Sequence, residues 1–252
     1  LLSDPEFDRF DLSAFRMKTC TSAPCSADLK AEILRRWPGG LIDIYGMTEG
    51  GGTMTLAAHL YPDKLETVGK PVDGHDVRLI DEEGNEVQPG AVGEVVGRSV
   101  AMMLHYHNQP EKTRAAEWRD AQGRRYIRTG DVGRFDADGF LTLLDRRKDM
   151  IISGGFNIYP SDIEAVLGAD PAVADCTVIG VPSEQWGETP VGFYVAVDST
   201  PPRTILERVN ARLGKTQRLA DLLPIEELPR SAIGKVLKRE LRDRFAASHA
   251  AA

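Results

Sequence analysis

The segment YGMTEGG (45–51) combines a glycine-rich turn with one hydroxyl, Thr48, and one carboxylate, Glu49. It follows the short apolar run LIDIY (41–45), which is typical of a β-strand. Backbone amides and a hydroxyl can hold phosphate oxygens, whereas a carboxylate repels phosphate unless a divalent cation bridges the two. These residue types predict that Glu49 is a Mg²⁺ ligand beside a phosphate group. The alternative is a glycine-rich surface turn that binds nothing.

Two further segments place a charged residue beside a glycine. In RTGD (128–131), Asp131 follows a Thr-Gly turn at the end of a strand-like stretch, and its carboxylate could accept hydrogen bonds from both hydroxyls of a ribose. In PRSAIGK (229–235), Lys235 lies on a loop before the last predicted helix and could carry positive charge into a site. The alternatives are an aspartate that bonds to its own turn, and a solvated lysine.

The general nucleotide-binding motifs are not supported by the sequence. LGKT (213–216) ends like a P-loop, but a valine occupies position 209, where the first glycine would fall. No G-x-G-x-x-G segment follows a strand, so a dinucleotide-binding fold is not indicated. A nucleotide site in this protein would therefore have to be built from the segments described above.

Composition limits the class of protein. With 252 residues, 42% of them hydrophobic and 27% charged, the chain has room for one large domain or two modest ones. No apolar run approaches the roughly 20 residues of a membrane-spanning helix, and the acidic opening LLSDPEFDRFDL is unlike a secretory leader. The net charge of −7 argues against general nucleic-acid binding. The spacing of the three cysteines suits neither a disulfide framework nor a metal site, so we expect a reducing, cytoplasmic location.

The first half of the sequence predicts an α/β segment and then a β-rich segment. Residues 26–37 have the amphipathic pattern of a helix, and 41–45 that of a strand. From residue 68 onward, short alternating stretches are separated by turns, which predicts a small antiparallel sheet or barrel. Its predicted strands are 76–81 and 91–99, which form a hairpin with Gly84-Asn85 at the bend, and then 125–136 and 140–145.

The second half predicts a small α+β domain over residues 150–245, after a charged cluster RRKD (146–149) that could act as a linker or hinge. Ser161 and Glu164 have the spacing of a capping box behind Pro160, which predicts a helix start. Further predicted elements are strands at 175–181 and 190–198, helices at 204–213 and 235–245, and a frayed tail at 246–252.

Taken in order, the segments YGMTEGG, YIRTGD, DRRKDMIISGGFNIYPSDIE and LPRSAIGKVLKREL resemble AMP-forming acyl-CoA synthetases of the adenylate-forming superfamily. TSAPCSADL (21–29) and VGKP (68–71) resemble further segments of that family. Its Ser/Thr/Gly-rich triphosphate loop ending in Pro-Lys-Gly has no counterpart in this sequence, so the chain resembles the C-terminal half of such an enzyme.

The resemblance implies a fold of mixed class, α/β with α+β. Residues 1–145 would be the end of the large adenylation domain, with an α/β segment at 1–67 and an antiparallel, β-barrel-like subdomain at 68–145. Residues 146–149 would be the hinge, and residues 150–245 the small mobile C-terminal domain.

The resemblance also implies a reaction in two steps. A carboxylic acid attacks the α-phosphate of Mg·ATP to give acyl-AMP and pyrophosphate, and CoA then displaces AMP to give acyl-CoA. Lys235 would be the catalytic cation of the first step, Glu49 would hold Mg²⁺, and Asp131 with Arg146 would hold the ribose. The remaining nucleotide-binding residues would be Ser22, Ala23, Pro24, Asp43, Tyr45, Gly46, Thr48 and Leu143.

For the second step, the resemblance implies that the small domain rotates at Lys148. The segment around Gly154, Gly155 and Phe156 would then face the site, where glycines let the pantetheine arm of CoA pass close to the backbone. Acetylation of Lys235 by a lysine acetyltransferase would remove its charge and stop the first step.

Several alternatives stay open. The acyl group could be passed to a carrier protein instead of CoA, the adenylate could be oxidised in a luciferase-like reaction, or the chain could be a non-catalytic nucleotide-binding fragment. The acid itself is not readable from the sequence, although small and apolar residues near 21–24 and 50–54 favour an aliphatic or aromatic acid over acetate.

Overall fold

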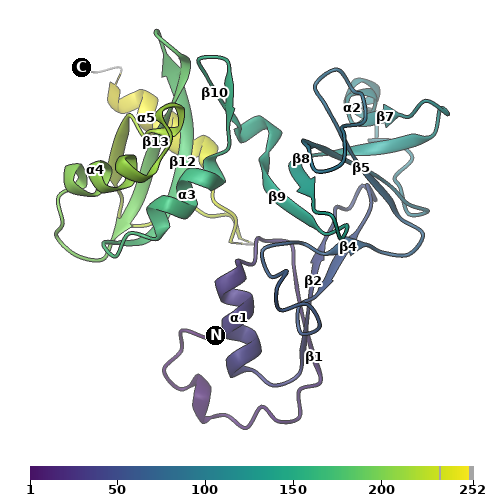
Figure 1. The fold of residues 1–252 in the computed structure, drawn as a ribbon, viewed down its shortest axis with the longest axis horizontal. Helices are drawn as coiled ribbons and strands as arrows, with labels where there is room; N and C mark the ends of the chain where they lie inside the picture. The colour runs from purple at the N-terminus through teal and green to yellow at the C-terminus, as the bar shows by residue number, and fades with distance from the viewer. Residues whose placement is uncertain (233, 250–252) are drawn as a thin grey trace. The chain divides into compact units, whose positions relative to one another are not determined.

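The computed structural model describes residues 1–232 and 234–249 (Figure 1). The chain forms two compact units, Leu1–Leu143 and Leu144–Ala252, and each is described here by itself. The change from one unit to the other falls within strand β9 (Leu141–Arg146), just before the charged cluster 146–149. The predicted mixed α/β and α+β class is confirmed. The hinge role of the cluster and the predicted domain limits stay predictions.

The first sheet of unit 1 has the strand order β1-β2-β3-β4. Strands β1 and β2 run parallel, so the chain must cross over between them, and helix α1 makes this connection. The side chain of Ser26 caps α1 by accepting a hydrogen bond from the Leu29 N–H at 3.2 Å. The predicted helix at 26–37 and strand at 41–45 are thereby confirmed. The element bounds are Phe7–Arg9 (η1), Met17–Thr21 (β1), Ala27–Arg36 (α1), Gly40–Tyr45 (β2), Met54–Ala57 (β3) and Lys70–Pro71 (β4).

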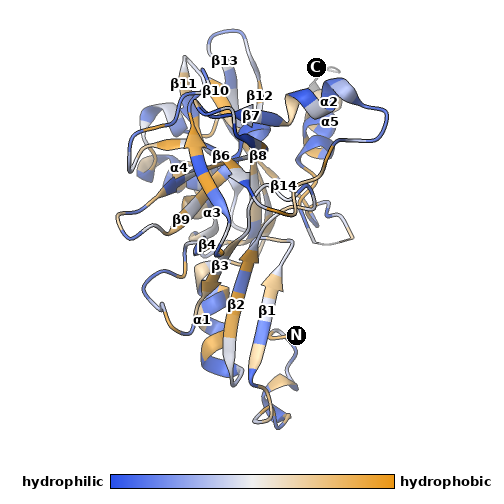
Figure 2. Cartoon of the chain, turned by 90° about the vertical axis from the view of Figure 1, so that its right-hand side faces the viewer, coloured by the Kyte–Doolittle hydropathy of each residue, from blue (hydrophilic) through white to orange (hydrophobic). Residues whose placement is uncertain are grey.

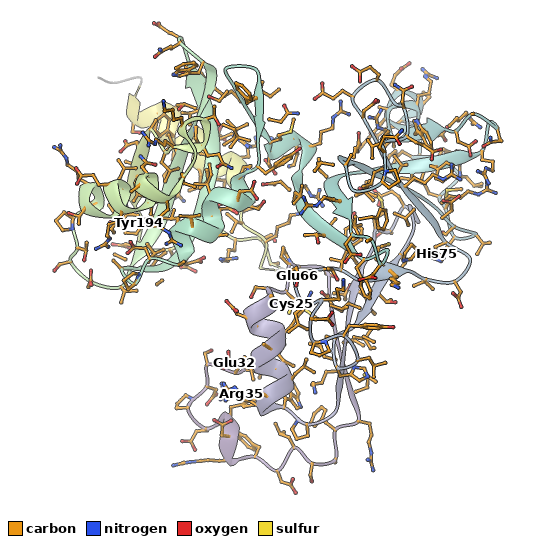
Figure 3. All side chains as sticks on the ribbon, viewed as in Figure 1. Cys25, Glu32, Arg35, Glu66, His75 and Tyr194 are labelled. Atoms are coloured by element: carbon orange, nitrogen blue, oxygen red, sulfur yellow. The ribbon has the colours of Figure 1, made fainter. Side chains whose placement is uncertain are left out.

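Helix α1 packs Ile33 and Leu34 into the core beside this sheet and carries charged residues such as Glu32 and Arg35 elsewhere on its surface (Figure 3). Figure 2 shows both kinds of residue along α1, whereas β2 is largely hydrophobic. The core between them contains the fully buried side chains of Leu41 and Leu56. Burial of this apolar surface holds the helix against the sheet.

A buried ion pair connects α1 to β2. Lys30, only 2% exposed, lies 2.6 Å from the carboxylate of Asp43. Its ammonium also donates to the carbonyl oxygens of Leu65 at 3.0 Å and Thr67 at 2.9 Å. The helix, the strand and the segment before β4 are thus tied together at a single buried cation.

The second sheet of unit 1 has the order β5-β6-β8-β7, with β9 added beside β8. The pairs β5–β6, β6–β8 and β7–β8 are all antiparallel. The predicted hairpin is confirmed, because β5 pairs with β6 and the turn between them is closed by a bond from the Asn85 N–H to Asp81. The bounds are Asp76–Ile80 (β5), Val92–Arg98 (β6), Pro110–Ala115 (α2), Glu117–Arg119 (β7), Arg125–Phe135 (β8) and Leu141–Arg146 (β9).

Unit 2 is an α+β layer with the strand order β11-β10-β13-β12. Strand β14 pairs with β13 in parallel, a connection that runs through α4. Helix α3 packs against β12, and the core under the sheet includes Ile163 and Tyr194 (Figure 3). The bounds are Arg147–Asp149 (η2), Ile151–Ser153 (β10), Phe156–Ile158 (β11), Pro160–Gly168 (α3), Val173–Ser183 (β12), Gly187–Ala196 (β13), Pro202–Arg212 (α4), Lys215–Gln217 (η3), Asp221–Pro224 (β14) and Lys238–His249 (α5).

The predicted capping box at α3 is wrong. Tyr159 is the N-cap and Pro160 the first helical residue, so Ser161 already lies inside the first turn and cannot cap it. The carboxylate of Glu164 has other partners, since it accepts hydrogen bonds from the Thr177 hydroxyl at 2.9 Å and the Val178 N–H at 2.8 Å. Glu164 therefore links α3 to β12.

The last helix differs from its prediction at both ends. It begins at Lys238, not 235, because the preceding loop closes on itself through a bridge between Arg230 and Val236 and a bond from the Leu237 N–H to the Pro229 carbonyl. It continues to His249, so the frayed tail predicted from 246 is wrong as far as 249, and positions 250–252 lie outside the described residues. Within the described residues, no helix is long and apolar enough to cross a membrane.

The Lys30–Asp43 pair yields a stability prediction. We expect Lys30→Met to lower the free energy of unfolding of unit 1 by about 3–5 kcal/mol, because it leaves the buried Asp43 charge without a partner. Lys64→Met is the control, because Lys64 pairs with the more exposed Asp136 and Asp138, and this variant should cost much less stability. Urea unfolding of both variants measures the difference. Equal losses would contradict the role assigned to burial.

Candidate nucleotide site

The loop predicted to bind phosphate begins where β2 ends, at Tyr45. The Tyr45 phenol donates a hydrogen bond to a carboxylate oxygen of Asp131 at 2.6 Å. These two residues are 86 positions apart and come from two different predicted motifs. The fold of unit 1 therefore brings the first residue of YGMTEGG and the last residue of RTGD into direct contact.

Asp131 lies inside strand β8, at an irregularity in its pairing with β6, and the Thr-Gly turn predicted to end this strand is therefore wrong. Gly130 has a positive φ of +73°, which glycine adopts without strain. The Thr129 hydroxyl donates to the Val95 carbonyl at 2.9 Å and accepts from the Asp131 N–H at 3.1 Å. The carboxylate of Asp131 is thus fixed at its backbone and by Tyr45, and the side chain is half-buried.

The segment Ser22–Pro24 lies at the same edge of the first sheet as the phosphate loop. It follows β1, whose last residue Thr21 is in register with Ile44 near the end of β2. Because parallel strands end at one edge of a sheet, the loops after β1 and β2 share that edge. Ser22 has a φ of +75°, a left-handed conformation that is uncommon for residues other than glycine. Its backbone is therefore held by the surrounding structure.

Asp43, predicted to contact the adenine, is a buried residue and not an exposed one. Its side chain is almost fully buried and bound by Lys30, and Cys20 is its register partner on β1. Burial raises the pKa of the nearby Cys25 thiol to about 12, with a further contribution from Cys20, so this thiol stays protonated at neutral pH. The adenine contact of Asp43 stays a prediction, and the structure adds a role in packing.

Thr48 and Gly46 are exposed in the phosphate loop, and Glu49 is half-buried. The Glu49 carboxylate accepts a hydrogen bond from the Tyr106 phenol at 2.8 Å. Among residues 1–232 and 234–249, no group of three or more His, Cys, Asp or Glu side chains could hold a metal ion. The single carboxylate fits Mg²⁺ only together with phosphate oxygens, which is a common way for proteins to bind this cation.

Leu143 and Tyr45 both pack against one hydrophobic cluster of unit 1. This cluster contains the buried side chains of Met54, Val95 and Leu141. It joins the end of β2 to strands β6 and β9, and Tyr45, which contacts Asp131, packs against it. A base held between Tyr45 and Leu143 stays a prediction.

In unit 2, the predicted CoA segment is a tight hairpin turn between β10 and β11. Gly154 and Gly155 have φ values of +58° and +81°, as a two-residue turn of this kind requires. A side chain on Gly154 would come within 3.0 Å of the Trp186 ring, whereas one on Gly155 would meet nothing within 4 Å. Phe156 and Trp186 are 61% and 50% exposed. Trp186 is not among the predicted residues, although an aromatic residue within the polar stretch PSEQWGE (182–188) is a signal that could have indicated it.

The other predicted residues of unit 2 lie in three different elements: a loop, the 3-10 helix η2 and the end of β9. Lys235 is half-buried, and its backbone forms a closed turn with Ser231 through bonds of 2.8 and 3.2 Å. Lys148 is exposed in η2, beside Asp149, which pairs with Arg242 of α5 at 2.9 Å. Arg146 is half-buried at the end of β9. Their predicted roles stay predictions.

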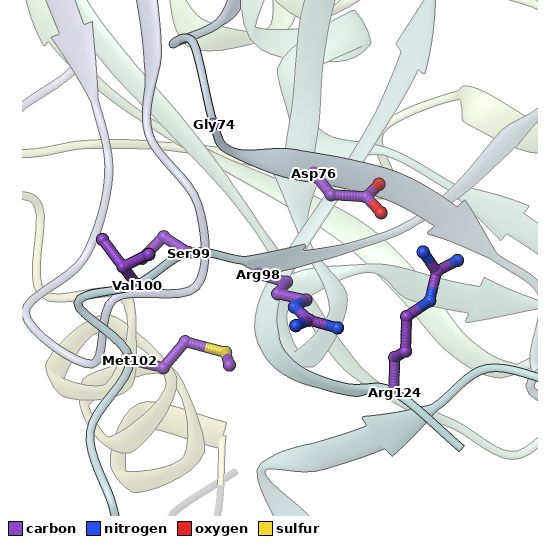
Figure 4. A pocket seen from close by; sticks show the side chains of 7 residues that line it. All are labelled: Gly74, Asp76, Arg98, Ser99, Val100, Met102 and Arg124. Atoms are coloured by element: carbon purple, nitrogen blue, oxygen red, sulfur yellow. The ribbon is translucent and has the colours of Figure 1, made fainter. Parts of the chain in front are cut away.

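A cavity in unit 1 lies apart from the predicted site residues (Figure 4). It measures about 380 Å³ and is lined by none of the predicted site residues. Its lining residues are Gly74, Asp76, Arg98, Ser99, Val100, Met102 and Arg124.

Comparison with known proteins identifies the family. The model of the AMP-binding enzyme family matches residues 1–107, and the model of the AMP-binding enzyme C-terminal domain matches residues 162–235. The chain belongs to the AMP-binding enzyme family. The predicted segment Ser22–Glu49 and the loop ending at Lys235 lie inside these matched stretches, whereas Asp131, Leu143 and Arg146 lie between them.

Individual members of the AMP-binding enzyme family are similar over nearly the whole chain. A fatty acid–[acyl-carrier-protein] ligase of Streptomyces coeruleorubidus is 38% identical over 251 residues, 97% of this chain and 47% of that protein. A feruloyl-CoA synthase of an Amycolatopsis species is 38% identical over 252 residues, 97% of this chain and 49% of that protein. The chain spans about half the length of these relatives.

A solved structure shares the fold. O-succinylbenzoate coenzyme A synthetase of Bacillus subtilis, in complex with ATP and magnesium ion, matches with a TM-score of 0.76 and 31% identity. The match covers 90% of this chain and 46% of the synthetase chain.

The phosphate loop yields a prediction at Gly50. Its φ is +75°, and a side chain there would lie 2.3 Å from the Ala101 carbonyl oxygen. We expect Gly50→Ala to lower the free energy of unfolding by about 1–3 kcal/mol more than Gly90→Ala does. Gly90 has a similar φ of +82° with nothing within 4 Å, so it controls for backbone strain alone. Thermal unfolding compares them, and equal midpoints would contradict the close approach.

Proposed function

We propose that this chain is the C-terminal half of an enzyme that uses ATP to convert a carboxylic acid into acyl-AMP and transfers the acyl group to CoA. The hydrogen bond between Tyr45 and Asp131 carries the proposal, because it joins two motifs predicted to bind one nucleotide. Family membership supports it, and so does the half-length match to relatives named as acid ligases.

In unit 1, Asp131 accepts hydrogen bonds from the ribose hydroxyls. Tyr45, Leu143 and the backbone of Ser22–Pro24 flank the adenine, with Asp43 and Gly46 beside it. The position of these loops at one sheet edge supports this arrangement. The exposed Thr48 hydroxyl donates to the α-phosphate.

Glu49 would hold Mg²⁺ together with the phosphates of ATP. The cation, when bound, neutralises charge on the phosphate oxygens and so lets a carboxylate approach them. The Bacillus subtilis structure with ATP and magnesium ion supports this assignment.

In unit 2, Lys235 supplies positive charge as negative charge builds up on the α-phosphate, and Arg146 assists at the ribose. Rotation at Lys148 then exchanges Lys235 for the Gly154–Phe156 turn, along which CoA binds. The open space at Gly155 supports passage of a narrow chain there, and the exposed rings of Phe156 and Trp186 could stack on a base.

Transfer to a carrier protein is the second candidate. It is favoured by the relative of Streptomyces coeruleorubidus, whose name gives an acyl-carrier protein as acceptor. The phosphopantetheine arm of a carrier has the same reactive end as CoA, so the Gly154–Phe156 turn suits either. Competition between CoA and a phosphopantetheinylated carrier for one acyl-AMP distinguishes the two acceptors.

Acetylation of Lys235 would regulate the proposed first step. Neutralising the ammonium removes the charge that this step requires, but leaves unit 2 folded. Mass spectrometry of protein from its native cell tests the modification, and its complete absence under all growth conditions would refute this form of control.

Two variants separate the proposed half-reactions in the complete protein. Lys235→Ala should slow ATP–pyrophosphate exchange by about 10²–10³-fold and leave thioester formation from supplied acyl-AMP almost unchanged. Gly155→Leu should do the reverse, because its side chain would block the path of the pantetheine arm.

Matched controls exclude general damage. Lys215→Ala removes an exposed lysine of η3, and Gly139→Leu places a side chain at φ +80° in open space elsewhere. Both should keep both half-reactions. Equal loss of both half-reactions in both test variants would refute the two-conformation proposal, and a complete protein without acid-dependent exchange would refute the activity.

A further inference from the structure

The segment of residues 99–106 is bonded to the phosphate loop at three points. The Ser99 hydroxyl donates to the Gly50 carbonyl at 2.9 Å, and the Met103 N–H donates to the Glu49 carbonyl at 2.9 Å. The third bond comes from the Tyr106 phenol to Glu49 Oε1 at 2.8 Å. Both the backbone and the side chain of Glu49 are therefore held by a segment more than 50 residues further along the chain.

This segment is itself anchored. The guanidinium of Arg125, on β8, donates to the carbonyls of Leu104 at 3.0 Å and Met103 at 2.6 Å. The Tyr106 N–H donates to the Thr113 hydroxyl at 3.0 Å, which ties the backbone of the tyrosine to α2. Hydrogen bonds to β8 and α2 thus hold the segment that carries the Tyr106 phenol.

The phenol remains a donor at neutral pH. A tyrosine hydroxyl ionises only at pH ~10, and the ionised Glu49 carboxylate 2.8 Å away can only accept, so the phenol is the donor of this bond. Its proton is therefore retained and directed at the carboxylate. A neutral donor orients a carboxylate without cancelling its charge.

The half-buried Glu49 differs from the buried carboxylates Asp43 and Asp149 in how its negative charge is treated. Asp43 is neutralised by Lys30 and Asp149 by Arg242. Among the residues that the structure describes, no lysine or arginine pairs with Glu49, whose side-chain partner is the phenol. Glu49 thus combines a fixed orientation with an uncompensated negative charge, which is what a cation ligand requires.

We propose that Tyr106 is a positioning residue, which holds the Glu49 carboxylate in the orientation that receives the divalent cation of a metal–nucleotide complex. The proposal rests on the function proposed above, in which Glu49 is the metal ligand. A donor behind a metal ligand commonly changes metal affinity by 10–100-fold, because it selects the binding orientation before the cation arrives.

The test measures Mn²⁺ binding to the complete protein in the presence of a non-hydrolysable ATP analogue, with free Mn²⁺ counted by electron paramagnetic resonance. Tyr106→Phe keeps the ring and removes only the hydroxyl, and should weaken Mn²⁺ binding about 10-fold. Tyr126→Phe is the matched control, since it also removes a phenol bonded to a carboxylate, Asp76 at 2.6 Å. It should leave Mn²⁺ affinity unchanged.

A double-mutant cycle separates positioning from general loosening of the loop. In a Glu49→Gln background, Tyr106→Phe should produce no further loss, because the carboxylate that it orients is gone. An equal loss in both backgrounds, or wild-type affinity in Tyr106→Phe, would overturn the positioning role. If Glu49→Gln itself binds Mn²⁺ as the wild type does, the metal assignment within the proposed function fails instead.

Discussion

The hydrogen bond between Tyr45 and Asp131 is the contact on which the candidate site depends. It connects the end of β2 in the first sheet with β8 in the second, and no local sequence relation links the two. Around it, the cluster containing Met54, Val95 and Leu141 keeps the sheets packed together. If the two sheets separated, the phosphate loop and Asp131 would no longer belong to one site.

Three carboxylates of unit 1 differ in their hydrogen-bond or ion-pair partners. Asp43 is buried and paired with a lysine, Asp131, inside β8, is held by a phenol, and Glu49 keeps its charge while a phenol fixes its direction. The first arrangement contributes mainly to packing, whereas the other two leave oxygen atoms able to bind a ligand. The same side-chain chemistry thus supports folding in one place and recognition in another.

Local features of the fold were readable from the sequence because local chemistry decides them. The cap at Ser26, the apolar run before Tyr45 and the turn at Asn85 each depend on neighbours a few residues away. The capping box at Ser161 failed for an equally local reason, since Pro160 already starts the helix there.

The tertiary partners of the site could not be read in the same way. Lys30 lies on a helix where a lysine is ordinarily solvated, and only the convergence of Asp43 and two carbonyls makes its burial favourable. Tyr106 likewise stands in a polar loop, with nothing nearby in sequence to indicate Glu49 as its partner. These contacts depend on which distant segments of the chain lie side by side in the fold. The spacing of hydrophobic residues along the sequence does not indicate this.

The ion pair between Asp149 and Arg242 has a consequence for biosynthesis. It joins the first turn of unit 2 to its last helix, and the neighbouring Leu241 fills a core position with no exposed surface. Unit 2 therefore cannot complete its core until residues 238–249 have emerged from the ribosome, whereas unit 1 has all of its strands available earlier. During translation, the first unit would be folded while the second still awaits its closing segment.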